Sequence, residues 1–250
     1  MISTLKINTI FLLLLLITHP TIQVYKAFLA SEKTELEEET ENKPSQAYDY
    51  YTLSLLWAPS ICDDIMYCQQ VLRSSDINQW IIKGIYPISK YGGGPTNCSK
   101  TKFNLNKIKK ETRSQLKQYW VPLKKIEKYK NYKVSWNKYG TCFDFSRYNT
   151  KRTEQEFFFS KALRLRSDLN PIYYGLSQNT EPNRIKVLLQ IFEDTLNTRP
   201  FLVCKLDKKL NQNLVEIRLS LDLNFKPVDN VGKEVLDKCD PNKIVYIPKA

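Results

Sequence analysis

The chain has a single histidine, His19, and histidine is the side chain that most readily takes and gives protons near neutral pH. Its surroundings have the layout of a secretory signal peptide, because Lys6 precedes an apolar run over residues 10–17 and small residues such as Ala30 follow. The run is shorter than the roughly 20 apolar residues that span a bilayer. We expect residues 1–30 to be a cleaved signal peptide, with an uncleaved anchor or a buried N-terminal helix as the alternative. The mature protein would be secreted, or held in a compartment such as a vacuole, and would contain no histidine.

Six cysteines follow this leader, and an even count in an exported chain predicts three disulfides. Their number alone allows 15 pairings. We do not expect a zinc site, because the domain lacks both histidine and a CxxC pair. The sequence therefore implies no metal and no other cofactor.

Other short motifs carry little chemistry. The sequence contains neither a GxSxG nucleophile elbow nor a P-loop, and Gly92–Pro95 is typical of a turn rather than of a phosphate-binding loop. Asn97-Cys98-Ser99 fits the N-glycosylation sequon, which makes Asn97 a candidate acceptor.

Charge divides the rest of the chain into two regions. Residues 31–48 are rich in glutamate, and this composition predicts a disordered acidic spacer. Residues 51–250 hold 34 of the 38 basic residues and 19 of the 26 acidic ones, a net charge of 34 − 19 = +15. We assign residues 49–250 to a single domain, whose charge favours a polyanionic partner such as RNA, an anionic membrane surface or an acidic polysaccharide. A basic surface that only aids solubility is the alternative.

The elements that must position any site are a mixture of strands and helices. Apolar and aromatic runs over residues 51–57 and 80–85 suit strands, and residues 215–223 alternate as in a half-buried antiparallel strand. Helical spacing extends over residues 105–120, and Thr153 with an acid three residues later marks another helix start. We expect an α+β domain in which an antiparallel sheet packs with several helices.

Three segments of the domain carry a family likeness. Residues 48–57, with a proline and a cysteine soon after, form the first; Trp80–Pro87 is the second and Trp136–Cys142 the third. Together they resemble the opening strand and the two active-site segments of the ribonuclease T2 family, particularly its plant S-like and self-incompatibility branches. The resemblance covers residues 48–248 and implies the ribonuclease T2 fold, cross-linked by disulfides. It also selects one cysteine pairing: Cys62–Cys68, Cys98–Cys142 and Cys204–Cys239.

The same resemblance identifies the active-site positions. Family members cleave RNA by transferring the phosphate to the neighbouring 2′-hydroxyl, using two histidines as base and acid and a cationic cluster. Here Lys83 stands at the first catalytic histidine and Tyr139 at the second. Val134 and Ser135 replace an auxiliary histidine and a glutamate, so that only Lys138 is retained. Unperturbed lysine (pKa about 10.4) and tyrosine (about 10) are protonated at neutral pH, so either can donate a proton but neither can act as the base.

These substitutions predict a pseudoenzyme of the T2 family, a secreted protein that binds single-stranded RNA or another polyanion without efficient cleavage. Lys83 and Lys138 are the candidate phosphate-binding residues. Trp57, Tyr86 and Tyr139 are candidates for base stacking, although such aromatic residues are more often part of the core.

Two other functions remain open at this stage. One is a residual or rewired endoribonuclease that cleaves single-stranded RNA through a 2′,3′-cyclic phosphate. The other is an extracellular protein-interaction, storage or defence protein with the same fold.

Overall fold

The computed structural model describes residues 48–62, 65–72, 77–121, 131–178, 183–229, 236–237 and 239–249. The expected signal peptide and almost all of the expected acidic spacer lie outside the described residues, so both stay predictions.

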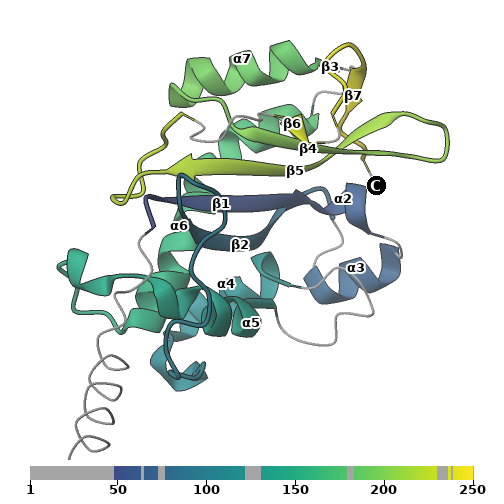
Figure 1. Cartoon of the computed structure of the whole chain (residues 1–250). Coiled ribbons are helices and arrows are strands. Elements are labelled where there is room, and N and C mark those ends of the chain that lie inside the picture. Colours follow the sequence, from purple (N-terminus) through teal and green to yellow (C-terminus); the bar gives the residue numbers. More distant parts are fainter. Residues whose placement is uncertain are drawn as a thin grey trace, which may run out of the picture. The chain divides into compact units, whose positions relative to one another are not determined.

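A seven-stranded sheet organises the described part of the domain, in the order β2-β1-β5-β4-β6, with β7 beside β5 and β3 beside β7 (Figure 1). The long strands pair antiparallel, β1 with β2 and β5, and β5 with β4, whereas β6 and β7 join β4 and β5 in parallel. The antiparallel core of the sheet and its expected strands are therefore confirmed. The strands are β1 Tyr50–Trp57, β2 Trp80–Ile88, β3 Asn183–Arg184, β4 Phe201–Leu206, β5 Gln212–Leu221, β6 Leu236–Asp237 and β7 Ile244–Tyr246.

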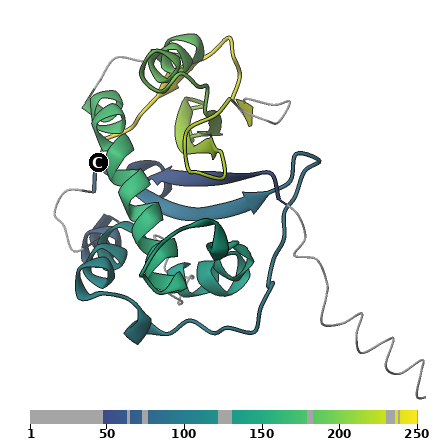
Figure 2. The same cartoon turned by 90° about the vertical axis from the view of Figure 1, so that its left-hand side faces the viewer.

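Helices α4, α5 and α6 contact β2, and α7 contacts β3 (Figures 1 and 2). Arg166 of α6 fixes part of this packing, because its Nε donates to the carbonyl oxygen of Trp80 at 3.0 Å while its guanidinium lies 3.8 Å from the ring centroid of Tyr119. None of the helices that the structure describes is long and apolar enough to cross a membrane. The helices are α2 Ala58–Ile61, α3 Ile65–Leu72, α4 Lys110–Tyr119, α5 Asn131–Lys138, α6 Glu154–Gln178 and α7 Ile185–Leu196, with 3₁₀ turns η1 Leu105–Lys107, η2 Gly140–Cys142 and η3 Phe145–Arg147.

The single helix expected over residues 105–120 is in fact two elements, η1 and α4. The chain is extended between them, at Ile108 and at Lys109. The backbone N–H of Lys109 donates to the carboxylate of Glu156 at 2.8 Å instead of to a helical carbonyl. The helix start expected at Thr153 is confirmed, since its hydroxyl accepts from the N–H of Glu156 at the head of α6.

All four tryptophans of the chain lie in the core. Trp57, Trp120 and Trp136 are fully buried, and Trp80 is 1% exposed. They pack among aromatic rings, such as Trp57 on Trp80 with centroids 5.2 Å apart and Trp136 on Phe158 at 5.7 Å. Burial of such large side chains is the main stabilising contribution to a domain of this size.

Three disulfides use all six cysteines and join the pairs that the family resemblance implied. Cys62–Cys68 connects the end of α2 to α3, and Cys204–Cys239 connects β4 to the C-terminal segment. Cys98–Cys142 connects the long segment after β2 to η2, which ends the segment Trp136–Cys142.

Candidate active site

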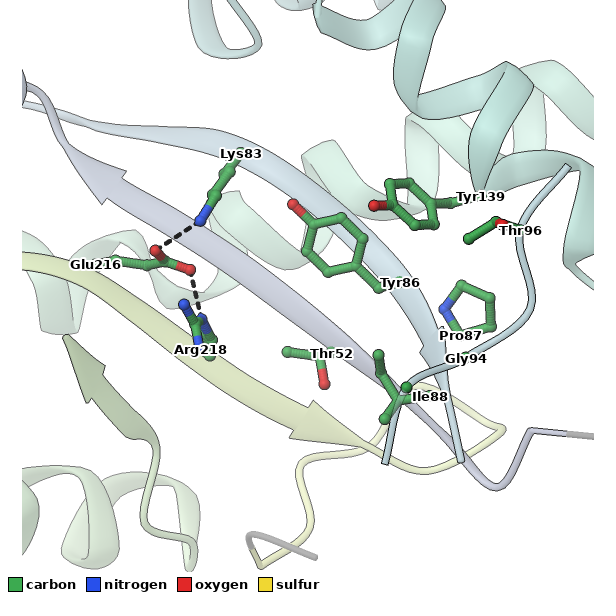
Figure 3. A pocket seen from close by; sticks show the side chains of 11 residues that line it. Thr52, Lys83, Tyr86, Pro87, Ile88, Gly94, Thr96, Tyr139, Glu216 and Arg218 are labelled. Carbon is green, nitrogen blue, oxygen red and sulfur yellow. Dashed lines mark hydrogen bonds and ion pairs between the residues drawn. The ribbon is translucent and has the colours of Figure 1, made fainter. Parts of the chain in front are cut away.

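A cavity of about 490 Å³ lies on the face formed by β1, β2 and β5 (Figure 3). Its floor comes from the three strands, and its walls come from the loop that follows β2 and from the residue that precedes η2. We call it the cleft. Its lining residues are Thr52, Lys83, Tyr86, Pro87, Ile88, Gly93, Gly94, Thr96, Tyr139, Glu216 and Arg218.

A β-bulge presents Lys83 to the cleft. Ser54 of β1 pairs with Gly84, but the next residue, Leu55, pairs with Ile82, so Lys83 is the extra residue of β2. Bulges often occur beside active sites because they redirect a side chain from the regular alternation of a strand. Lys83 is exposed within β2, between buried neighbours on both sides.

Lys83 does not stand free in the cleft, because its Nζ lies 2.8 Å from Oε2 of Glu216 (Figure 3). The other carboxylate oxygen of Glu216 accepts from Nε of Arg218 at 2.6 Å and from the hydroxyl of Ser54 at 2.7 Å. The Glu216 side chain is 5% exposed, whereas that of Lys83 is 44% exposed. Burial raises the pKa of the Glu216 carboxyl, but hydrogen bonds from Arg218, Lys83 and Ser54 outweigh burial and hold that pKa below its usual range.

Two tyrosines lie beside this ion-pair network. The ring of Tyr86 passes over Gly84, where a Cβ would come within 2.5 Å of it, and meets Tyr139 edge to face with centroids 4.7 Å apart. Burial, and then the negative charge of Glu216, raise the pKa of the Tyr86 phenol. Tyr86 is therefore a neutral hydrogen-bonding group at any physiological pH, not a base.

The loop after β2 forms one wall of the cleft. It begins with the expected turn, in which the N–H of Ser89 donates to Gly93 at 2.9 Å. Gly94 approaches β2 so closely that a Cβ there would lie 2.0 Å from the carbonyl oxygen of Pro87. Asn97 is exposed with φ 56°, and its N–H donates to the carbonyl oxygen of Lys138 at 2.7 Å. Its glycosylation stays a prediction, at a position next to the cleft residue Thr96.

The second active-site segment contributes fewer cleft residues than expected. Tyr139 lines the cleft, and Lys138 lies next to it, with its Nζ 5.1 Å from the Tyr139 ring centroid. Val134 is 51% exposed on α5 and does not line the cleft. Ser135 is 5% exposed, and its hydroxyl has no hydrogen-bond partner among the described residues.

Trp57 corrects one expectation. It was a candidate for base stacking, but its side chain is fully buried and its indole N–H donates to the carbonyl oxygen of Pro248 at 2.7 Å. Trp57 is the last residue of β1, the strand that lies between β2 and β5. Its ring packs on the ring of Trp80. No face of its ring is available to a base, so it is a core residue.

Sequence reasoning missed Glu216, Arg218 and Ser54. Glu216 and Arg218 occupy the polar positions of the alternating strand, which we expected to face solvent. Instead Glu216 is 4% exposed, because β5 lies in the interior of the sheet and its polar face forms the floor of the cleft. The sequence did offer one signal for this pair, because Glu216 and Arg218 are opposite charges at alternate positions of one strand.

The cleft can hold an anion more readily than it can transfer a proton. Lys83 and Arg218 contribute two positive charges and Glu216 one negative charge, which leaves +1 among the lining residues. Glu216 is ionised and has a lowered pKa, so it is a weak base. No group of three histidine, cysteine, aspartate or glutamate side chains in the described residues could hold a metal ion.

Comparisons with known proteins agree with this geometry. A family model described as the Ribonuclease T2 family matches residues 48–239. Ribonuclease 3 of Arabidopsis thaliana is 23% identical over 212 residues, which cover 82% of this chain and 91% of that protein. The crystal structure of RNase NT in complex with 5′-AMP has a TM-score of 0.67 at 17% identity, covering 82% of this chain and 100% of that one. Trichomaglin, described as an S-like ribonuclease, has a TM-score of 0.62 at 22% identity, covering 81% and 98%. Because this family model matches well over half of the chain, and the fold agrees with it, the chain belongs to the ribonuclease T2 family.

Proposed function

We propose that this chain is a catalytically degenerate member of the family that binds single-stranded RNA or another polyanion without efficient cleavage. The observation that carries the proposal is the ion pair between Lys83 and the buried Glu216. Lys83 stands where the family resemblance puts a catalytic histidine, and its amine already bonds a carboxylate. It cannot accept a proton while it is an ammonium ion.

The other cleft groups offer no substitute base. The raised pKa of Tyr86 keeps its phenol protonated, and the lowered pKa of Glu216 makes its carboxylate a weak acceptor. General acid–base groups typically contribute about 10²–10⁴-fold each to a rate. Losing both the general base and the general acid should lower RNA cleavage by at least about 10⁴-fold if their effects multiply.

Binding has better support than catalysis. Lys83, Arg218 and the adjacent Lys138 provide positive charge, and the exposed parts of Tyr86 and Tyr139 provide aromatic edges beside it. RNase NT, a protein of similar fold, has been crystallised with 5′-AMP. A phosphate that enters the cleft of this chain must compete with Glu216 for Lys83, so we expect weak binding that depends strongly on salt.

A residual endoribonuclease is the second candidate. Lys83 and Arg218 lie on either side of Glu216 in the cleft and are suited to stabilise negative charge that develops on a phosphate in a transition state. Such an activity would depend on these cations and would lack the bell-shaped pH profile that an imidazole pair gives.

The test combines cleavage of a fluorescent single-stranded RNA from pH 4 to pH 9 with anisotropy measurements on the same sample. We expect no cleavage above that of the Lys83→Ala, Lys138→Ala variant, and binding that weakens with salt and weakens further in this variant. Lys186→Ala with Lys208→Ala removes the same charge from two exposed positions outside the cleft and serves as the control. Turnover that disappears only in the cleft variant would establish the residual enzyme instead. Affinity that is equal at low and physiological salt would end the phosphate-binding proposal.

A further inference from the structure

A second cavity, of about 550 Å³, lies where the segment between η1 and α4 meets the residues that lead into α6. Figure 1 shows α4 below the sheet and α6 passing behind it. None of the residues that line this second cavity also lines the cleft. We call it the α4–α6 basin, and it is lined by Lys107, Lys109, Asn149, Thr150, Lys151, Arg152, Thr153 and Glu156.

The basin carries more uncompensated positive charge than the cleft. Its lining holds four cations and one carboxylate, a net charge of 4 − 1 = +3, whereas the cleft has +1. The carboxylate, Glu156, is 4% exposed, and its two oxygens accept from the N–H of Lys109 and the hydroxyl of Thr112, both at 2.8 Å. None of the four cations forms an ion pair within the part of the chain that the structure describes.

The backbone frame that carries these cations is fixed by hydrogen bonds between segments far apart in the sequence. The hydroxyl of Thr153 donates to the carbonyl oxygen of Lys107 at 2.6 Å. Gln155 accepts from the N–H of Asn104 at 2.8 Å and donates to the carbonyl oxygen of Lys102 at 3.0 Å. The four cations are therefore held near one another, although like charges repel, and a bound anion would relieve that repulsion.

The chemistry of the lining residues indicates which class of ligand the basin can bind. Lysine amines, the Arg152 guanidinium and the Asn149 amide are donors suited to phosphate oxygens, and arginine can bind them through two hydrogen bonds. Among the residues that the structure describes, no aromatic side chain lines the basin, so they offer no surface on which a base can stack.

We propose that the α4–α6 basin binds closely spaced phosphate groups, independently of the cleft. Consecutive phosphates of an RNA backbone and a short inorganic polyphosphate share this chemistry. Binding should not depend on base identity, because only the phosphates reach the cations.

The experiment titrates the full secreted chain with tripolyphosphate and, separately, with a short oligouridylate, by calorimetry at several salt concentrations. The basin variant carries Lys107→Gln, Lys109→Gln and Lys151→Gln. The frame bonds at Lys107 and Lys109 use main-chain atoms, so we expect this variant to fold, which its unfolding midpoint checks. The control variant, Lys186→Gln, Lys205→Gln and Lys208→Gln, removes the same charge from exposed positions that line neither cavity.

We expect the basin variant to bind tripolyphosphate about tenfold or more weakly, since charge-assisted hydrogen bonds are lost, while the control variant changes little. If RNA also uses the basin, the slope of log affinity against log salt should fall by about 2, because each phosphate contact on a single strand contributes about 0.7. A loss confined to tripolyphosphate would identify free polyphosphate as the source, and it would still support the site. Equal behaviour of the basin and control variants with both ligands would overturn it. The Lys83→Ala, Lys138→Ala variant alters the cleft and leaves the basin unchanged. If this variant still binds tripolyphosphate, the basin site stands even where the proposed function of the cleft fails.

Discussion

At the scale of single residues, the main feature of the cleft is one buried carboxylate that accepts hydrogen bonds from three neighbouring side chains. Glu216 bonds Lys83, Arg218 and Ser54, which come from three adjacent strands. A buried charge is tolerated only when it is paired and hydrogen-bonded, and here that pairing also restrains the two cations of the cleft. Removing one partner of this network would leave a buried charge unpaired, which is strongly destabilising.

A pH-dependent stability follows from this network. The pKa of Glu216 is lowered in the folded protein, so its contribution is fully present above the unfolded-state value, near 4.5, and is lost as the pH falls through the folded value. We expect Glu216→Gln to lower the free energy of unfolding by about 1–3 kcal/mol at pH 7. The difference from the wild type should shrink below about pH 4.5.

Urea unfolding at pH 7, 5, 4 and 3 measures this difference. Glu193→Gln is the matched control, because Glu193 pairs with Arg199 on the surface, where a salt bridge contributes about 0–1 kcal/mol. A Glu216→Gln effect of the same size at every pH would contradict the assignment of the ion pairs.

The sequence could indicate Lys83 and Tyr139 because each lies in a short recognisable segment. For Glu216, which is 133 residues from Lys83, the sequence offered only the alternating charges of an amphipathic strand, and this pattern also fits an ordinary surface position. The stacking role expected for Trp57 was wrong for a similar reason. Whether an aromatic residue at the end of a strand is buried depends on which strands and rings lie on either side, and that is a tertiary property.

At the scale of elements, the cleft is built from a bulged strand and a loop that a disulfide fastens to η2. Cys98–Cys142 closes a sequence separation of 44 residues and joins the loop wall to the segment of Tyr139. Cys62–Cys68 closes a separation of only 6. The two bridges should therefore differ both in their contribution to stability and in their effect on the cleft.

We expect removal of Cys98–Cys142 by paired serine substitutions to cost about 4 kcal/mol, and removal of Cys62–Cys68 about 2.4 kcal/mol, since the loop-entropy contribution grows with loop length. Denaturant unfolding under non-reducing conditions compares the two variants. The first variant should also weaken RNA binding, because the cleft wall loses its covalent attachment, and the second should not. A larger loss of stability from the short bridge would contradict the entropic argument.

The elements also show where helical pattern alone misleads. The spacing of residues 105–120 suits one helix, yet Glu156 of a distant helix captures the N–H of Lys109 and the chain breaks there. The acid of the Thr153 motif is thus used between elements, not to close a capping box. Lys109, where the chain breaks, also lines the α4–α6 basin.

At the scale of the whole molecule, net charge could be summed from the sequence but its distribution could not. The +15 of residues 51–250 predicts a polyanionic partner in general terms. How that charge is distributed between the cavities depends on which carboxylates pair with which cations in the folded protein. Glu216 reduces the charge of the cleft, whereas Glu156 turns toward the backbone and leaves the basin strongly basic.

The expected signal peptide leads to a prediction for the expression of residues 1–250. Expression in a eukaryotic secretory host should release protein into the medium, with an N-terminus close to residues 28–31, after the small residues Ala27 or Ala30. N-terminal sequencing and intact mass measure this, and the mass also reports a glycan on Asn97, with Asn97→Gln as the control. Retention of the full chain in the membrane fraction, with Met1 in place, would support the uncleaved anchor instead.

The burial of every tryptophan has a spectroscopic consequence. Trp57, Trp80, Trp120 and Trp136 are at most 1% exposed, so their emission should be blue-shifted and resistant to soluble quenchers such as iodide as long as the core is packed. A ligand in the cleft meets tyrosine rings, and a ligand in the basin meets none at all. Intrinsic tryptophan fluorescence therefore reports the folding state of this protein almost independently of what it binds, which allows stability and affinity to be followed separately in one cuvette.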